Sequence, residues 1–229
     1  MHKLNIRTVF FDLDDTLYDY ALPNKKAMDE IYRFFLLEHK IERVVCETAF
    51  IQARSLIKEQ LGPTASSHSR LLYFQKTFEI LHIPFSSEAL VSLEDLFWDT
   101  FIDNSIVAEG VIPFLKYLQL LNINIGIITD LTLQIQLKKI QALGLDKYIS
   151  SITASEEAGQ DKPDSKIYEI ALHKEGVLGM HSAMIGDNYE KDMIGAKNMG
   201  FTTFWRHGSE QKKFADYSFQ KYSELHQWF

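Results

Sequence analysis

The sequence predicts an α/β fold, in which a parallel sheet with helices forms a core and a helical segment is inserted into it. Short apolar runs alternate with helical patterns, which is typical of a parallel sheet covered on both faces. Between residues 19 and 103 this alternation stops, and amphipathic patterns follow one another with no strand between them. We therefore expect a core of residues 1–18 and 104–229 and a helical cap domain of residues 19–103.

Five apolar runs are the expected core strands, at residues 8–11, 123–128, 149–153, 183–185 and 201–205. Helical patterns at 131–143 and 193–199 end at Gly144 and Gly200, because glycine readily adopts the left-handed conformation found at helix ends. In the first of these helices, Leu133, Leu137 and Ile140 form the expected apolar stripe. The cap is expected to contain helices at residues 25–38, 44–61, 70–81 and 88–101.

Composition narrows the classes of function. The 229 residues include 31 Asp and Glu against 24 Lys and Arg, and this acidic balance argues against a non-specific nucleic-acid binder. The most apolar stretch, residues 111–129, is interrupted by polar side chains and does not predict a membrane span. A single cysteine, Cys46, excludes an internal disulfide and is interpreted as a buried apolar residue. We expect a cytoplasmic protein, either a monomer or a homodimer.

Polar side chains follow the expected strands at their carboxyl ends, where ligands bind in parallel sheets. Any one of them alone is more often a turn residue or helix cap, so the interpretation depends on all of them together. Clustered carboxylates suit Mg²⁺, and a lysine with a threonine hydroxyl suits a phosphoryl group. One carboxylate can attack phosphorus while another transfers protons. The residues concerned are Asp12, Asp14, Thr16, Thr129, Lys162 and Asp187.

Four motifs in this order resemble those of the haloacid dehalogenase-like hydrolase superfamily. The segment FFDLDDTL, at residues 10–17, is similar to its first motif, DxDxT. Residues 127–130 (IITD) resemble the second motif and residues 162–164 (KPD) the third. Residues 185–187 (IGD), with Asp192 further on, resemble the fourth. The resemblance covers the whole chain and implies a Rossmann-like core with an inserted helical cap.

The resemblance also implies the catalytic roles. Asp12 would be the nucleophile and a Mg²⁺ ligand, and Asp14 would be the general acid and base, with its backbone carbonyl on the metal. Asp187 would be a further Mg²⁺ ligand. The presence of Asp14 favours hydrolysis of phosphate esters over displacement of halide, and the motif pattern as a whole disfavours the phosphonate-cleaving branch.

The remaining motif residues would hold the phosphoryl group or support the site. Thr129, Asp130 and Lys162 would bind phosphate, Asp192 would orient the metal ligands or the lysine, and Thr16 would stabilise the loop after the nucleophile. In the cap, His68 and Arg70 are candidates for contacting the leaving group, although a solvated helix start explains them equally well. Tyr18 is a candidate pocket wall, with a core aromatic as the simpler interpretation.

Three acidic residues depart from the usual pattern: Asp130 stands where Asn is common, Asp161 precedes Lys162, and Asp15 adds an acid to the first motif. Facing a phosphate, they would raise the electrostatic cost of binding, so we expect their side chains to point away. The leading hypothesis is a Mg²⁺-dependent phosphomonoesterase acting on a nucleoside monophosphate or a sugar phosphate. The alternatives are a phosphosugar mutase and a catalytically idle domain that binds a ligand or partner.

Overall fold

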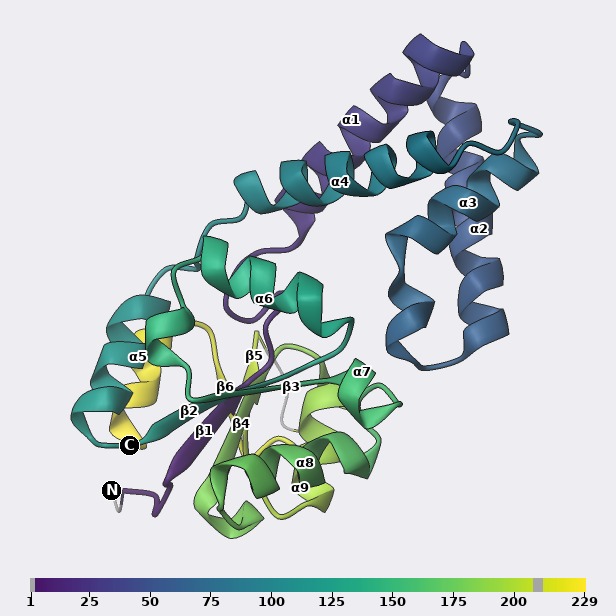
Figure 1. Ribbon diagram of the computed structural model, residues 1–229. Helices are drawn as coiled ribbons and strands as arrows, with labels where there is room; N and C mark the ends of the chain where they lie inside the picture. The colour runs from purple at the N-terminus through teal and green to yellow at the C-terminus, as the bar shows by residue number, and fades with distance from the viewer. Residues whose placement is uncertain (1–2, 208–211) are drawn as a thin grey trace. The chain divides into compact units, whose positions relative to one another are not determined.

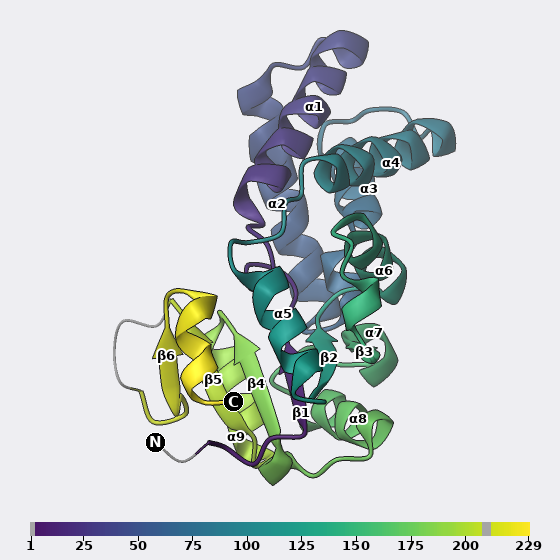
Figure 2. The ribbon, with the colours of Figure 1, turned by 90° about the vertical axis from the view of Figure 1, so that its left-hand side faces the viewer.

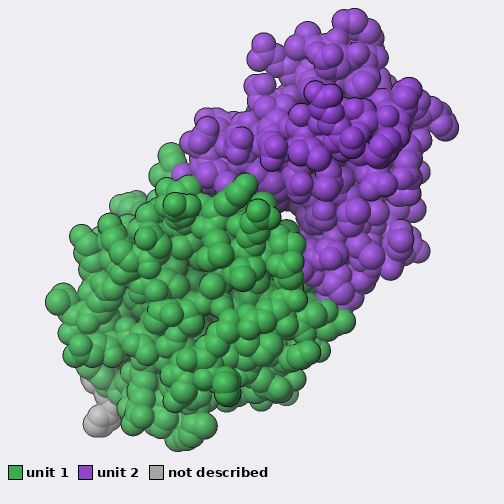
Figure 3. All heavy atoms as spheres, in the orientation of Figure 1, with its two compact units in different colours: residues 1–19, 106–229 green, residues 20–105 purple. Residues whose placement is uncertain are grey.

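The computed structural model describes residues 3–207 and 212–229, and the chain divides into two compact units (Figures 1 and 3). One unit comprises Met1–Asp19 together with Ile106–Phe229, and the other comprises Tyr20–Ser105. Among the described residues, every strand lies in the first unit, whereas the second is helical. No helix in the described ranges is both long enough and apolar enough to cross a bilayer.

The first unit contains a six-stranded sheet in the order β3-β2-β1-β4-β5-β6, and every neighbouring pair is parallel. The predicted α/β fold is thereby confirmed. The strands are β1 (Thr8–Phe11), β2 (Asn124–Thr129), β3 (Ser151–Ala154), β4 (Ser182–Gly186), β5 (Thr202–Arg206) and β6 (Tyr217–Phe219). The sequence analysis did not predict β6, which has only three residues and pairs with the edge of β5.

Helices cover both faces of this sheet (Figure 2). Phe10 and Phe11 are adjacent in β1, so their side chains point to opposite faces. Phe11 contacts Phe114 of α5, with ring centroids 6.3 Å apart, whereas Phe10 contacts Phe201, at 5.6 Å, which in turn meets Tyr168 of α8. The helical segments of this unit are α5 (Val111–Leu120), α6 (Leu133–Ala142), α7 (Ser155–Ala158), α8 (Ser165–Glu175), α9 (Gly195–Asn198), a π-helix at Tyr189–Ile194, and the 3₁₀ turns at Asp146–Tyr148, Gly179–His181 and Tyr222–Gln227.

The strand register places the expected site residues at one edge of the sheet. Phe11, the last residue of β1, is aligned with Ile127 of β2 on one side and with Ile185 of β4 on the other. Asp12 directly follows β1, Asp187 directly follows β4, and Thr129 is the last residue of β2. All three lie at the same edge of the sheet, because parallel strands present their carboxyl ends to the same side.

The second unit contains α1 (Ala21–His39), α2 (Arg43–Leu61), a 3₁₀ turn at Ala65–His68, α3 (Arg70–Ile80) and α4 (Ser87–Asp103). Aromatic side chains form much of its interior, including a contact between Phe35 and Phe78 with centroids 5.6 Å apart. Cys46 is completely buried, and burial raises the pKa of its thiol to about 12. It is a small core residue, as the sequence analysis expected.

Two helices differ from their predictions. The predicted stripe of Leu133, Leu137 and Ile140 is wrong at Leu137, which is 47% exposed, whereas Ile140 is buried as expected. The polar side chains of Gln136 and Lys139 are completely buried on the same helix. The helix predicted at residues 193–199 is α9 only from Gly195 on, since the chain before it forms a π-helix at Tyr189–Ile194. Gly144 and Gly200 do have the expected left-handed conformation, with φ of 64° and 82°.

The close packing of β2 against β1 generates a prediction about stability. A Cβ atom at Gly126 would lie 2.5 Å from Cδ1 of the buried Phe10 ring, so Gly126→Ala should lower the free energy of unfolding by about 1–3 kcal/mol. Urea denaturation followed by circular dichroism measures this change. The control Leu120→Ala, at a side chain that is 81% exposed, should change stability by less than about 0.5 kcal/mol. Equal stabilities for the two variants would contradict the packing argument.

Candidate active site

A buried lysine lies at the centre of the site. The ammonium of Lys162 donates to Oδ1 of Asp12 at 2.5 Å, to Oδ1 of Asp192 at 2.6 Å and to the backbone carbonyl of Ile128 at 3.1 Å. The side chains of Lys162 and Asp192 are 2% and 1% exposed. Although burial lowers the pKa of Lys162, its carboxylate neighbours outweigh this effect, and the net pKa lies well above the ordinary value.

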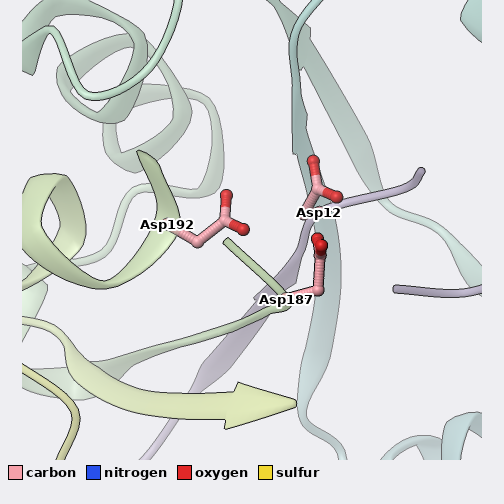
Figure 4. A group of neighbouring side chains, drawn as sticks. All are labelled: Asp12, Asp187 and Asp192. Carbon is pink, nitrogen blue, oxygen red and sulfur yellow. The ribbon is translucent and has the colours of Figure 1, made fainter. Parts of the chain in front are cut away.

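Three carboxylates meet beside this lysine, after β1, after β4 and in the π-helix (Figure 4). One carboxylate oxygen from each of Asp12, Asp187 and Asp192 lies within 4.8 Å of the others. Thr16 Oγ1 lies 3.2 Å from Asp12 and 3.3 Å from Asp187, so its hydroxyl links the two strand ends.

The energetics of these acids fit a bound cation. Burial raises the pKa of Asp12 well above its usual value, despite Lys162, and Asp192 and Asp187 raise it further. Burial, together with Asp192 and Asp15, raises the pKa of Asp187 to about 6. A hard divalent cation between Asp12 and Asp187 would relieve this repulsion through oxygen ligands of the type that Mg²⁺ prefers. Asp192 already accepts from Lys162 and, at 3.0 Å, from the backbone N–H of Asn188, which suits it to positioning the lysine.

Asp14 lies in a separate polar cluster. Its two carboxylate oxygens accept from Nζ of Lys139 at 2.8 and 3.0 Å, and the Tyr18 hydroxyl donates to Oδ1. Burial raises the pKa of Asp14, but the charge and hydrogen bonds of Lys139 outweigh burial, so the net pKa is below the ordinary value. Tyr18 is completely buried, and here it contacts the Asp14 carboxylate.

The expected phosphate-binding residues Thr129, Asp130 and Lys162 are held together by hydrogen bonds. The hydroxyl of Thr129, which is 1% exposed, accepts from Nε2 of Gln136 at 2.6 Å. The Asp130 carboxylate accepts from the backbone N–H of Lys162 at 2.9 Å and pairs with Lys191 at 2.6 Å. The second and third motifs are therefore linked directly.

The three unusual acids lie in different surroundings. The Asp130 carboxylate accepts hydrogen bonds from the backbone N–H of Lys162 and from the ammonium of Lys191. The positive charge of Lys191 balances the negative charge of Asp130. Asp161 is 5% exposed, whereas Asp15 is exposed and has a left-handed φ of 58°. Lys191 thus explains how an acid is accommodated where the motif usually has an amide.

Two candidates, His68 and Arg70, belong to the helical unit. The guanidinium of Arg70 lies over the rings of Phe97, Trp98 and Tyr73, with its carbon 5.0, 5.4 and 5.5 Å from the ring centroids. It also donates to the backbone carbonyl of His68 at 2.9 Å and to the hydroxyl of Tyr20. These contacts give Arg70 a packing role inside its own unit.

Sequence reasoning missed several polar residues that contact the motif residues. Lys139 and Gln136, three residues apart on α6, face Asp14 and Thr129. Their spacing was the available signal, because polar residues three apart lie on one face of a helix. Trp205 of β5 donates from its indole N–H to the backbone carbonyl of Asp187 at 2.8 Å.

Residues 6–200 match the sequence profile of a family described as haloacid dehalogenase-like hydrolase. The chain belongs to the haloacid dehalogenase-like hydrolase family. It is 33% identical over 206 residues to a ribulose-1,5-bisphosphate 5-phosphatase from Halopiger xanaduensis, covering 89% of this chain and 85% of the relative. It is 30% identical over 203 residues to a glyceraldehyde 3-phosphate phosphatase from Pyrococcus abyssi, covering 87% and 81%.

Solved structures of this hydrolase family share the fold. A haloacid dehalogenase-like (HAD) phosphatase from Thermococcus onnurineus superimposes with a TM-score of 0.73 at 22% sequence identity, and the match covers 97% of each chain. At that identity the likeness shows the architecture alone.

Cation binding by this hydrolase should depend on pH. Below about pH 6 the Asp187 carboxyl is protonated, and its proton must leave before the oxygen can bind a cation. The affinity for Mn²⁺, measured by electron paramagnetic resonance, should fall at least about tenfold for each pH unit below 6. The exposed Glu190→Gln should leave binding unchanged, whereas Asp187→Asn should weaken it strongly. An affinity that is constant from about pH 7 to about pH 5 would contradict a ligand role for Asp187.

Proposed function

We propose that the protein is a Mg²⁺-dependent phosphomonoesterase that hydrolyses a small phosphorylated metabolite through an aspartyl-phosphate at Asp12. The observation that supports this most directly is the setting of the Asp12 carboxylate. One of its oxygens contacts the Lys162 ammonium at 2.5 Å, and the other lies 3.2 Å from the Thr16 hydroxyl, next to Asp187. This carboxylate is held in place beside a cation that can also attract a phosphoryl group.

In the first half of the reaction, an Asp12 oxygen attacks phosphorus and the bond from phosphorus to the leaving oxygen breaks. Asp14, two residues further along the loop, gives a proton to that oxygen; because Lys139 lowers its pKa, this carboxylate has to take up the proton from solvent before the transfer. Lys162 and the hydroxyl of Thr129 hold the phosphoryl oxygens during the transfer. A divalent cation held by Asp12, Asp187 and the backbone carbonyl of Asp14 would neutralise the charge on the phosphoryl oxygens.

In the second half, water attacks the phosphorus atom of the aspartyl-phosphate. Asp14, now ionised, takes a proton from that water, the bond from phosphorus to the Asp12 oxygen breaks, and inorganic phosphate is released. The same side chain thus returns to its starting protonation state. Asp192 and the backbone carbonyl of Ile128 keep Lys162 in place throughout.

Sugar phosphates are the proposed substrate class. The printed names of two relatives at 33% and 30% identity describe phosphatases of ribulose-1,5-bisphosphate and of glyceraldehyde 3-phosphate, which supports a small phosphorylated sugar over a nucleotide. In this proposal residues 20–105 act as a cap that encloses the leaving group and excludes water. A small soluble substrate and a reduced cysteine are consistent with action in the cytoplasm.

A phosphosugar mutase and an idle binding domain are the competing hypotheses. Acidic residues near Lys162 are the feature that favours an idle domain, and the pairing of Asp130 with Lys191 weakens this argument. A mutase would interconvert sugar phosphates without releasing free phosphate, so the assay below separates it from a hydrolase.

Phosphate release tests the proposed function. The purified protein should release phosphate from at least one of ribulose 1,5-bisphosphate, glyceraldehyde 3-phosphate, nucleoside monophosphates and p-nitrophenyl phosphate, with Mg²⁺ and not with EDTA. Asp12→Asn should lower kcat at least about 1,000-fold because the nucleophile is lost. Asp14→Asn should lower it about 100-fold or more.

The matched control is Asp146→Asn, an exposed acid in the 3₁₀ turn that precedes β3, which should keep the wild-type kcat. A folded protein that releases no phosphate from any substrate contradicts the hydrolase proposal, and isomerised product without free phosphate identifies a mutase.

A further inference from the structure

Lys139 is a completely buried cation outside the four motifs. It lies in the last turn of α6, on the same face as the buried Ile135, Gln136 and Ile140, whereas Leu137 points to solvent. Burying an ammonium costs several kcal/mol unless it is paired, and an apolar side chain at this position would avoid that cost. The lysine therefore requires an explanation other than packing.

Its partner in the structure is Asp14. Nζ of Lys139 lies 2.8 Å from Oδ1 and 3.0 Å from Oδ2, so a single ammonium contacts both carboxylate oxygens. The Tyr18 hydroxyl donates to Oδ1, and the Tyr18 ring centroid lies 5.9 Å from Nζ. The three hydrogen bonds fix the rotation of the carboxylate about its Cβ–Cγ bond.

The pair is buried unequally. The Lys139 side chain has no exposed surface, whereas the Asp14 side chain is 32% exposed. The lysine thus holds the carboxylate from the protein side and leaves its other side open. The exposed part of the Asp14 carboxylate is where a reacting oxygen, from a leaving group or from water, would approach.

We propose that Lys139 is a positioning residue that fixes the Asp14 carboxylate in the orientation from which it transfers protons. This inference rests on the proposed phosphatase function. Asp14 gives a proton to the leaving oxygen in the first half of the reaction and takes one from water in the second. Lys139 exchanges no proton in either half, and it keeps the carboxylate in the same place for both.

Kinetics of Lys139→Met test this role, because methionine fills the same space without the charge. With a sugar phosphate, kcat should fall at least about tenfold, while KM changes less than about threefold. With p-nitrophenyl phosphate, whose leaving group departs without protonation, the burst of p-nitrophenol should keep its rate. The adjacent Lys138→Met is the matched control at an exposed position and should behave as the wild type does.

A double-mutant cycle separates positioning from a merely structural effect. In the Asp14→Asn background, Lys139→Met should change kcat less than about twofold, because the group that the lysine positions is no longer a proton donor. An equal loss of kcat in both backgrounds would overturn the proposal. If circular dichroism shows that Lys139→Met does not fold, Lys139→Gln, which retains one donor to Asp14, enters the same cycle with the same criterion.

The outcome for the wild type distinguishes the two proposals. A wild-type protein that releases phosphate, combined with additive losses in the cycle, overturns only the role of Lys139. A folded wild-type protein without phosphate release overturns the proposed function and this role together.

Discussion

The Lys162 ammonium is the interaction on which the site depends. Its three hydrogen bonds join the end of β1, the end of β2 and the π-helix through Asp12, Ile128 and Asp192. The buried carboxylates of Asp12 and Asp192 repel each other, and burial also disfavours their charged forms. The Lys162 ammonium between them is therefore needed to keep both in place. One lysine is not sufficient, because burial still raises the pKa of Asp12 well above its usual value.

Backbone shape brings the acids to this lysine. A Cβ atom at Gly186 would clash with the Asp192 carboxylate, so β4 has to end in a glycine for Asp192 to approach. Asn188 then caps the π-helix by accepting from the N–H groups of Glu190 and Lys191, at 3.1 and 3.0 Å. The wide turn returns Asp192 toward β4, where its second oxygen accepts from the N–H of Asn188. A π-helix in this position is therefore part of the site, as is common for such helices.

Sequence patterns could predict the strands of the core, but they could not predict the contacts between segments that are distant in the sequence. Continuous apolar runs predicted five of the strands, because a strand that is covered on both faces is apolar at almost every position. The buried face of α6 was predicted wrongly, because a pattern of apolar and polar residues assigns every polar residue to the solvent side. Gln136 and Lys139 instead face the protein interior, where they contact Thr129 and Asp14. The Lys191 pairing with Asp130 joins residues 61 apart, and no local signal predicts it.

Each lysine in these contacts pairs with an acid of the site, but the acids outnumber the lysines. Five of the motif acids lie in these contacts with three lysines: Lys162 contacts Asp12 and Asp192, Lys139 contacts Asp14, and Lys191 contacts Asp130, while Asp187 lies beside Asp12. If all five acids were ionised, two negative charges would remain, and they would be concentrated where Asp12 and Asp187 meet. Burial is the largest cause of the raised pKa values of these two acids, and the neighbouring carboxylates raise them further. In the proposed function, a divalent cation would supply the missing charge and would let a phosphate dianion enter a site built from acids, because the cation and the lysines together would outweigh the local repulsion.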